Sequence, residues 1–169
     1  EHGSIELVDG AQATIDVRVI NRNALTIGPS SHLATASFQQ LAGGTTLQGG
    51  TLTGSGPFGV QLAGGQLTGY GIIQGALTVT QTGRIAPGLA AGDASAISAW
   101  SDVTFLGGTY AVDLLGTPGF MIDRLLVDGV VTLGGRLEVS LGGGFTPVAG
   151  DFFDIITSPH AILGAFAHV

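Results

Sequence analysis

Residues 49–56, GGTLTGSG, and residues 64–71, GGQLTGYG, are two copies of one short unit. Six of their eight positions are identical when Gly49 is aligned with Gly64. Each copy is a glycine pair followed by a short segment with apolar residues at alternate positions. Glycine supplies the positive φ angles of tight turns, and the alternation is typical of a β-strand with one buried face. The unit therefore predicts a turn and a strand that recur along the chain.

Weaker copies of this unit occur on both sides of the pair. The tetrapeptide LAGG stands at residues 41–44 and again at 62–65, and glycine-led strand patterns begin at residues 75, 107 and 134. One copy cannot bury its apolar face alone, whereas stacked copies bury a continuous ladder of Leu, Ile and Val. We therefore predict an all-β fold whose body is a parallel β-solenoid (β-helix).

Composition favours the same fold class. Glycine accounts for 30 of 169 residues, only 10% of the residues are charged, and no Asp, Glu, Lys or Arg lies between Arg22 and Arg84. The helices of a soluble bundle need a charged solvent face, which this stretch does not offer. We expect a single domain over residues 1–169. Its parts are an N-terminal strand segment (1–22), a mostly uncharged repeat body (23–100) and a β-rich C-terminal cap (101–169).

The flanking segments show strand patterns of their own. Residues 13–20, ATIDVRVI, alternate cleanly and predict a half-buried strand, which forms a hairpin if residues 5–8 pair with it across the Asp9-Gly10 turn. Residues 33–41 are compatible with one or two turns of helix. In the C-terminal third we expect strands at residues 103–105, 109–115, 124–127, 130–133, 136–141 and 152–157.

Charge limits the partners of the chain. Five arginines, no lysine and twelve carboxylates give a net charge of −7. A nucleic-acid surface needs clustered Lys and Arg, so nucleic acid is excluded as a partner. The sequence lacks an apolar run of about 18 residues and a signal-like start, so we expect no membrane insertion and no signal peptide. The absence of cysteine excludes disulfides and thiolate chemistry.

Motifs for chemistry are weak. Residues 54–59, GSGPFG, satisfy G-x-G-x-x-G formally, but no helix or acidic partner follows, so we interpret them as a turn. We expect the four histidines at the surface or in turns, and Trp100 and the phenylalanines in the core or a cap. We expect no cofactor. Calcium remains the alternative because many aspartates stand in turns, although no D-x-D-x-D-G loop is present.

Residues 73–79 and 83–88, IQGALTV and GRIAPG, resemble the repeat signature of bacterial autotransporter passengers. Residues 107–166 are similar to the segment that often follows it, with GGTYAVDL, DRLLVDG, LGGRLEV and GDFFDII in order. The resemblance spans roughly residues 43–166. It implies a β-helical stalk on the outer surface of a bacterium, as in adhesins and surface filaments, with no catalytic residues. The chain is then either a fragment of such a protein or a free-standing subunit.

Three functions remain open. The first is a structural extracellular protein that self-assembles as a homopolymer into a surface filament or adhesin stalk. Its subunits join end to end or through a donated strand, for which Ala13, Ile15, Val17 and Val19 are the candidate residues. The second is a module that binds a glycan or a host or cell surface. The third is a β-helical polysaccharide-degrading enzyme, whose carboxylate pair would be Asp151 with Asp154 or Asp123 with Asp128. We expect no enzymatic activity.

Overall fold

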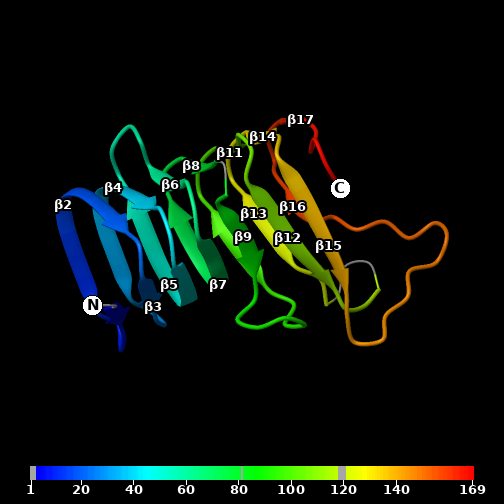
Figure 1. The fold of residues 1–169 in the computed structure, drawn as a ribbon, viewed down its shortest axis with the longest axis horizontal. Coiled ribbons are helices and arrows are strands. Elements are labelled where there is room, and N and C mark those ends of the chain that lie inside the picture. The colour runs from blue at the N-terminus through cyan, green and yellow to red at the C-terminus, as the bar shows by residue number, and fades with distance from the viewer. Residues whose placement is uncertain (1–2, 81, 118–120) are drawn as a thin grey trace.

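The computed structural model describes residues 3–80, 82–117 and 121–169. Within these ranges the regular structure consists of strands and contains no helix, which confirms the predicted all-β class. The helical turns considered for residues 33–41 are wrong. Those residues belong almost entirely to a strand, because their apolar side chains are buried at alternate positions. All 17 strands form one curled sheet, and every pairing between named strands is parallel (Figure 1).

The pairings divide the strands into three ladders, and four long strands bend at a corner and contribute to two of them. The first ladder contains β1 (Ser4–Leu7), β3 (Ala24–Ile27), the first halves of β5 (Gly44–Gly54) and β7 (Gln66–Gln74), β9 (Arg84–Pro87), β12 (Thr109–Leu114) and β15 (Arg136–Leu141). The second contains the first halves of β2 (Gln12–Asn21) and β4 (His32–Gln40), the second halves of β5 and β7, β10 (Ala96–Ala99), β13 (Arg124–Val127) and β16 (Ile156–Thr157). The third contains the second halves of β2 and β4, β6 (Val60–Leu62), β8 (Leu77–Val79), β11 (Val103–Phe105), β14 (Val131–Leu133) and β17 (Ile162–Gly164).

The chain visits the three ladders in a fixed order, and each round of three advances it along the sheet from the N-terminal to the C-terminal end (Figure 1). We call one round a rung. As far as β9, paired residues are close in sequence, as in Val60↔Leu77 and Gly44↔Gln66. Beyond β9 the separation is larger, as in Arg84↔Thr109 and Leu125↔Ile156. The ladders continue through residues 101–169, and five of the six strands expected there form with differences of at most one residue at their ends. The strand expected at residues 152–157 is wrong for residues 152–155, which belong to a loop, and only β16 forms there.

The predicted N-terminal hairpin does not form. Strands β1 and β2 pair with β3 and β4 respectively, both in parallel, and not with each other. Asp9 (φ 55°) and Gly10 (φ 76°) turn the chain at a corner of the rung, so β1 and β2 lie in different ladders. The predicted strand at residues 13–20 forms within β2, but none of its residues is buried.

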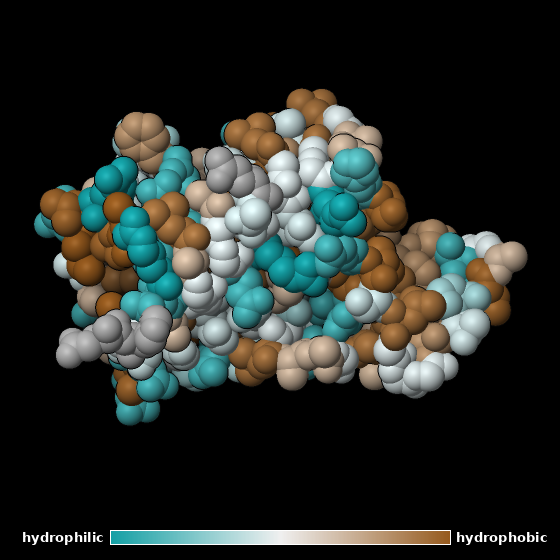
Figure 2. All heavy atoms as spheres, viewed as in Figure 1, coloured by the Kyte–Doolittle hydropathy of each residue, from teal (hydrophilic) through white to brown (hydrophobic). Residues whose placement is uncertain are grey.

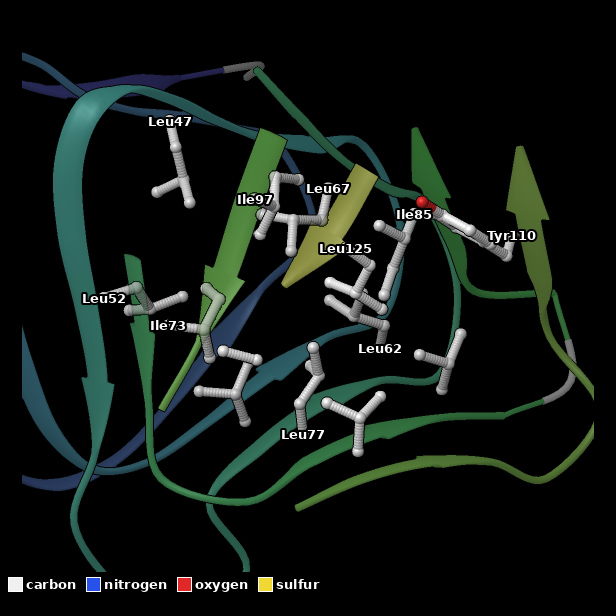
Figure 3. Packing of buried hydrophobic residues seen from close by; sticks show 14 of the residues in the cluster. Leu47, Leu52, Leu62, Leu67, Ile73, Leu77, Ile85, Ile97, Tyr110 and Leu125 are labelled. Carbon is white, nitrogen blue, oxygen red and sulfur yellow. The ribbon is translucent and has the colours of Figure 1, made fainter. Parts of the chain in front are cut away.

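The core lies inside the curl and is built from columns of side chains in register. One column per ladder shows the pattern, and every member of the three is buried: Leu25, Thr45, Leu67, Ile85 and Tyr110; Leu33, Leu52, Ile73, Ala99 and Val127; Phe38, Val60, Leu77, Val103 and Val131. Figure 3 labels six of these residues, namely Leu52, Leu67, Ile73, Leu77, Ile85 and Tyr110. Each column places successive side chains about 4.8 Å apart, so the apolar side chains of one rung cover those of the next.

Glycine fixes the spacing at the tightest corner. Gly69 has φ 91°, and a Cβ atom there would lie 1.8 Å from the carbonyl oxygen of Leu47 in the preceding rung. Only glycine permits both this backbone conformation and this approach.

One polar group interrupts the core near the N-terminal end. Gln40 and Thr45 are completely buried. The side-chain oxygen of Gln40 accepts hydrogen bonds from the Thr45 hydroxyl at 2.6 Å and from the Asn21 amide at 3.0 Å. The Gln40 Nε2 donates to the carbonyl of Ala42, so both ends of the buried amide are satisfied, and the bonds to Gln40 join adjacent rungs.

Candidate functional site

The candidate assembly residues lie together at the N-terminal end of the sheet. Ala13, Ile15, Val17 and Val19 all belong to β2, which is the first strand of two ladders. The exposed fractions of Ile15 and Val17 are 39% and 63%, while Ala13 and Val19 are partly buried. Their exposure corrects the half-buried strand that the sequence predicts.

The register with β4 explains the exposure of the residues that it pairs, while Val17 lies in the register shift between Ile15 and Arg18. Ala13 is in register with buried Leu33, and Val19 is in register with buried Phe38. In the first ladder, Ile5 precedes buried Leu25 and is 63% exposed. These side chains follow the inward pattern of the body, but no earlier rung covers them among the described residues. Among the described residues, this end of the sheet is therefore an uncovered cross-section of an apolar core, and Figure 2 shows brown side chains there.

The backbone at this end is also open. Within residues 3–80, β1 pairs only with β3, and β2 pairs only with β4. A parallel strand with one unpaired edge presents N–H and C=O groups that a further strand can bind. We define the N-terminal end face as Ile5, Ala13, Ile15, Val17 and Val19 together with these strand edges.

The C-terminal end is built differently, because aromatic side chains pack over its core. The Phe166 ring lies 5.6 Å from Phe105 and 6.5 Å from Tyr110, measured between centroids. The Tyr110 hydroxyl donates a hydrogen bond of 2.8 Å to the carbonyl of Ile155. Burial raises the pKa of Tyr110 well above its usual value, so this hydroxyl remains a donor. We call this group the aromatic cap.

Part of the C-terminal strand edge is covered as well. The backbone N–H of Leu137 donates to His168 at 2.9 Å, and that of Ala167 donates to Gly135 at 2.8 Å. The chain end thus lies beside the start of β15 and occupies groups that a further strand would need. Beyond β15, residues 142–155 form a loop that extends past the last rung (Figure 1). In this loop Phe145 and Phe153 pack together, with centroids 5.9 Å apart.

Aspartates in the C-terminal half bind backbone N–H groups. Asp123, only 2% exposed, accepts hydrogen bonds of 2.9 Å from Ser95 and from Asp113. Asp113 accepts one of 2.7 Å from Gly92. These bonds fasten the loop between β9 and β10 to β12. Burial raises the pKa of Asp123 to about 6; the two N–H bonds act against this, and the charges of Asp113 and Asp93 add to it.

One of the two carboxylate pairs weighed for catalysis is too widely separated to form a paired site. Asp123 and Asp128 flank β13 at opposite ends, about 16 Å apart along an extended strand. Asp151 accepts a hydrogen bond of 2.9 Å from the Val148 N–H and so stabilises a turn. Asp154 is exposed. Among the described residues, no group of three or more His, Asp or Glu side chains is placed to hold a metal ion.

The glycine motif at residues 54–59 is a loop between β5 and β6. Its N–H groups bind the previous rung, with Gly56 donating to Ala36 at 2.7 Å and Ser55 donating to Thr35 at 2.9 Å. His32 lies on β4, where its Nε2 is 2.8 Å from the Thr53 hydroxyl, and His160 lies exposed in a bend.

The described part of the chain has no helix with the length and apolarity needed to cross a membrane.

Sequence reasoning missed the exposure of several aromatic residues. Trp100, expected in the core or a cap, is 55% exposed, and Phe58 and Phe152 are 64% and 71% exposed. Trp100 directly follows β10, whose last residue, Ala99, points inward and is buried. Alternation along the strand therefore turns the indole outward. This register could have been found from the alternation of residues 96–100.

The geometry defines an all-β chain with a curled, parallel sheet and two unlike ends. No protein-family model matches the chain, and neither a curated protein nor a solved structure matches it. Its function must therefore be inferred from the ends and surfaces described above.

Proposed function

We propose that the chain is a β-solenoid module that builds an extracellular filament or adhesin stalk by stacking end to end on further copies of itself. The observation that carries the proposal is the N-terminal end face, where an apolar core ends in open strand edges. The solenoid part of the proposal is supported by the fixed order of the three ladders and by their parallel registers.

Parallel pairing favours head-to-tail stacking. All strands of a ladder run in one direction, so a second copy can continue the ladders in parallel only if its C-terminal end meets the N-terminal end face. Such an interface joins two different surfaces and leaves one of each free, which produces an open filament unless the rotation closes a ring. At the C-terminal end the start of β15 is already bound by residues 167–168, so a stacked copy uses the remaining edges and exposed apolar side chains. These are Val139 and Leu141 on β15 and Ile162 on β17, with exposed fractions of 44%, 54% and 45%.

The donated-strand arrangement receives less support. Strand β2 is in register with β4 at eight residue pairs, so it already completes the ladders of its own chain. Donation to a neighbour would break these pairings, whereas stacking uses only the edge of β2 that faces away from β4. We therefore propose stacking as the mode of assembly.

The location outside a bacterial cell rests on the resemblance of residues 43–166 to autotransporter passenger repeats. The proposal assigns no catalytic role to the chain. The aspartates that the sequence offered for catalysis bind backbone N–H groups or stand apart, as Asp151, Asp123 and Asp128 do. We propose further copies of the chain as the main partner.

Electron microscopy and sedimentation across a concentration series test the proposal. We expect the unaltered chain to form fibres of constant width as its concentration rises. Val17→Asp places a charge on the N-terminal end face, where burial against a neighbour would be costly, and should give folded monomers. The matched control is Leu106→Asp, because Leu106 is 67% exposed at a corner of the body, close to the 63% of Val17.

Fibres from the unaltered chain and from Leu106→Asp, but not from Val17→Asp, would support stacking at this face. Monomers at every concentration would overturn it, and so would equal assembly of the two variants. A deletion of residues 1–22 separates the two modes of assembly. It exposes the next rung with its own apolar columns, so stacking should survive, whereas assembly by a donated N-terminal strand would be lost.

A further inference from the structure

We propose that the groove beside Trp100 binds a neutral polysaccharide, with the indole ring stacked on a sugar ring. The groove is a hollow of about 340 Å³ on the outer face of the second ladder, lined among others by Ser98, Trp100, Leu126, Asp128 and Thr157. It is separate from the N-terminal end face, so the inference goes beyond the assembly proposed above.

The register of the sheet gathers these side chains on one face. Ser98 is in register with Leu126, and Leu126 is in register with Thr157, so the three point outward from adjacent strands. Trp100 and Asp128 each stand one residue beyond buried Ala99 and Val127, which are partners in register. The Asp128 N–H donates to the carbonyl of Ala99 at 2.8 Å, which continues the register as far as Trp100 and Asp128. The indole and the carboxylate therefore occupy neighbouring rungs.

The chemistry of the groove matches a sugar. A sugar ring has an apolar C–H face, which packs on an indole, and a rim of hydroxyl groups, which bind carboxylates and hydroxyls. Trp100 supplies a flat apolar surface that is 55% exposed, and Asp128 is an exposed acceptor. Ligand sites typically combine an apolar surface with a small number of precisely placed polar groups. Ser98 and Thr157 add hydroxyl groups on either side of Leu126.

A line of polar side chains extends the site along the same face. Thr53 and Gln74 occupy the same outer column as Trp100, because Thr53 is in register with Gln74 and the backbone N–H of Trp100 donates to Ile73 at 2.9 Å. The Thr53 hydroxyl donates to the Gln74 side chain at 2.8 Å and also lies 2.8 Å from His32 Nε2. These bonds hold the polar groups in fixed positions one rung apart, as suits an extended chain of sugars.

Other ligand classes fit less well. The described residues lining the groove include no Arg or His, and the chain carries a net charge of −7, so phosphates and acidic polysaccharides are disfavoured. Strands β10 and β13 are paired on both sides, which leaves no edge for an extended peptide at the centre of the groove. A neutral polysaccharide is the ligand that the side chains favour.

Trp100 is the only tryptophan of the chain, so its fluorescence reports on this groove alone. The Val17→Asp variant serves as the background for the titrations, because it keeps the groove in monomers and separates this test from assembly. The probes are the hexasaccharides of β-1,4-glucose, β-1,3-glucose, α-1,4-glucose and β-1,4-mannose, with oligogalacturonate as the acidic comparison. We expect a saturable change in emission with at least one neutral probe and none with oligogalacturonate.

Calorimetry on variants then identifies the side chains. Trp100→Ala should weaken binding about tenfold or more, since a truncated aromatic anchor removes most of the contact. Asp128→Asn should weaken it by a smaller factor, and Leu106→Ala should leave it unchanged. The absence of a response to all four neutral probes would overturn the proposal. So would equal affinity of Trp100→Ala, or a preference for oligogalacturonate.

Discussion

The two ends of the sheet differ in how far their apolar core residues are covered. At the N-terminal end, Ile5 and Val17 are each 63% exposed and the strand edges are unpaired within the described residues. At the C-terminal end, Phe166 packs on Phe105 and Tyr110, and the backbone of residues 167–168 binds the start of β15. The comparison teaches that apolar side chains near an end of the sheet are covered only where another segment of the chain packs over them.

The largest expected effect comes from equal truncations in the body and at the N-terminal end. Leu52 is completely buried in a central rung, and Leu52→Ala should lower the free energy of unfolding by about 2–5 kcal/mol through lost burial and a cavity. Ile5→Ala should change it by about 0.5 kcal/mol or less, since Ile5 is largely exposed. Denaturant unfolding of monomers measures both. Similar losses for the two variants would show that the N-terminal end face is covered in solution.

Phe166→Ala tests the other end. The substitution removes two ring contacts and uncovers Phe105 and Tyr110, so we expect a loss of about 1–2 kcal/mol in the free energy of unfolding. The variant should also bind more of a dye that fluoresces on exposed apolar surface. Phe152→Ala is the matched control, because Phe152 is 71% exposed and should contribute little. Equal behaviour of the two variants would contradict the aromatic cap.

The smallest effect concerns the pH dependence of the C-terminal half. The pKa of Asp123 is raised from 3.8 to about 6, so between these pH values the folded chain binds a proton that the unfolded chain does not. Linkage then makes the free energy of unfolding rise as the pH falls from 7.5 to 5. Asp123→Asn should remove this contribution, while Asp128→Asn at an exposed position should keep it. Melting temperatures at pH 7.5, 6 and 5 measure the difference, and an unchanged pH dependence in Asp123→Asn would contradict it.

The sequence predicted the strands well because local alternation and glycine turns determine them. The units at residues 49–56 and 64–71 do each contain a turn and a strand. However, the offset between these two units is not the repeat of the sheet. Thr51 lies in the second ladder and Gln66 in the first, and Gln66 is in register with Gly44. A glycine pair followed by alternating residues specifies a corner and a strand, but it does not specify the ladder.

Burial and the surface features could not be predicted in the same way. Residues 13–20 alternate as a buried strand does, yet they lie exposed because coverage depends on a neighbouring rung. The exposure of Trp100 depends on where β10 ends, and the burial of Asp123 depends on backbone groups of Ser95 and Asp113 from other segments. Such contacts join distant parts of the sequence, so no local pattern shows them.

The change in rung length along the chain has a consequence for how such a protein can vary. Paired residues lie farther apart in sequence beyond β9 than before it, yet the strands remain in parallel register. The additional residues lie in corner loops such as residues 88–95 and 142–155, outside the columns of the core. The number of residues in a rung can therefore change while the register of the strands stays the same. The corners are sites where evolution or an engineer can add new segments without changing the packing of the core.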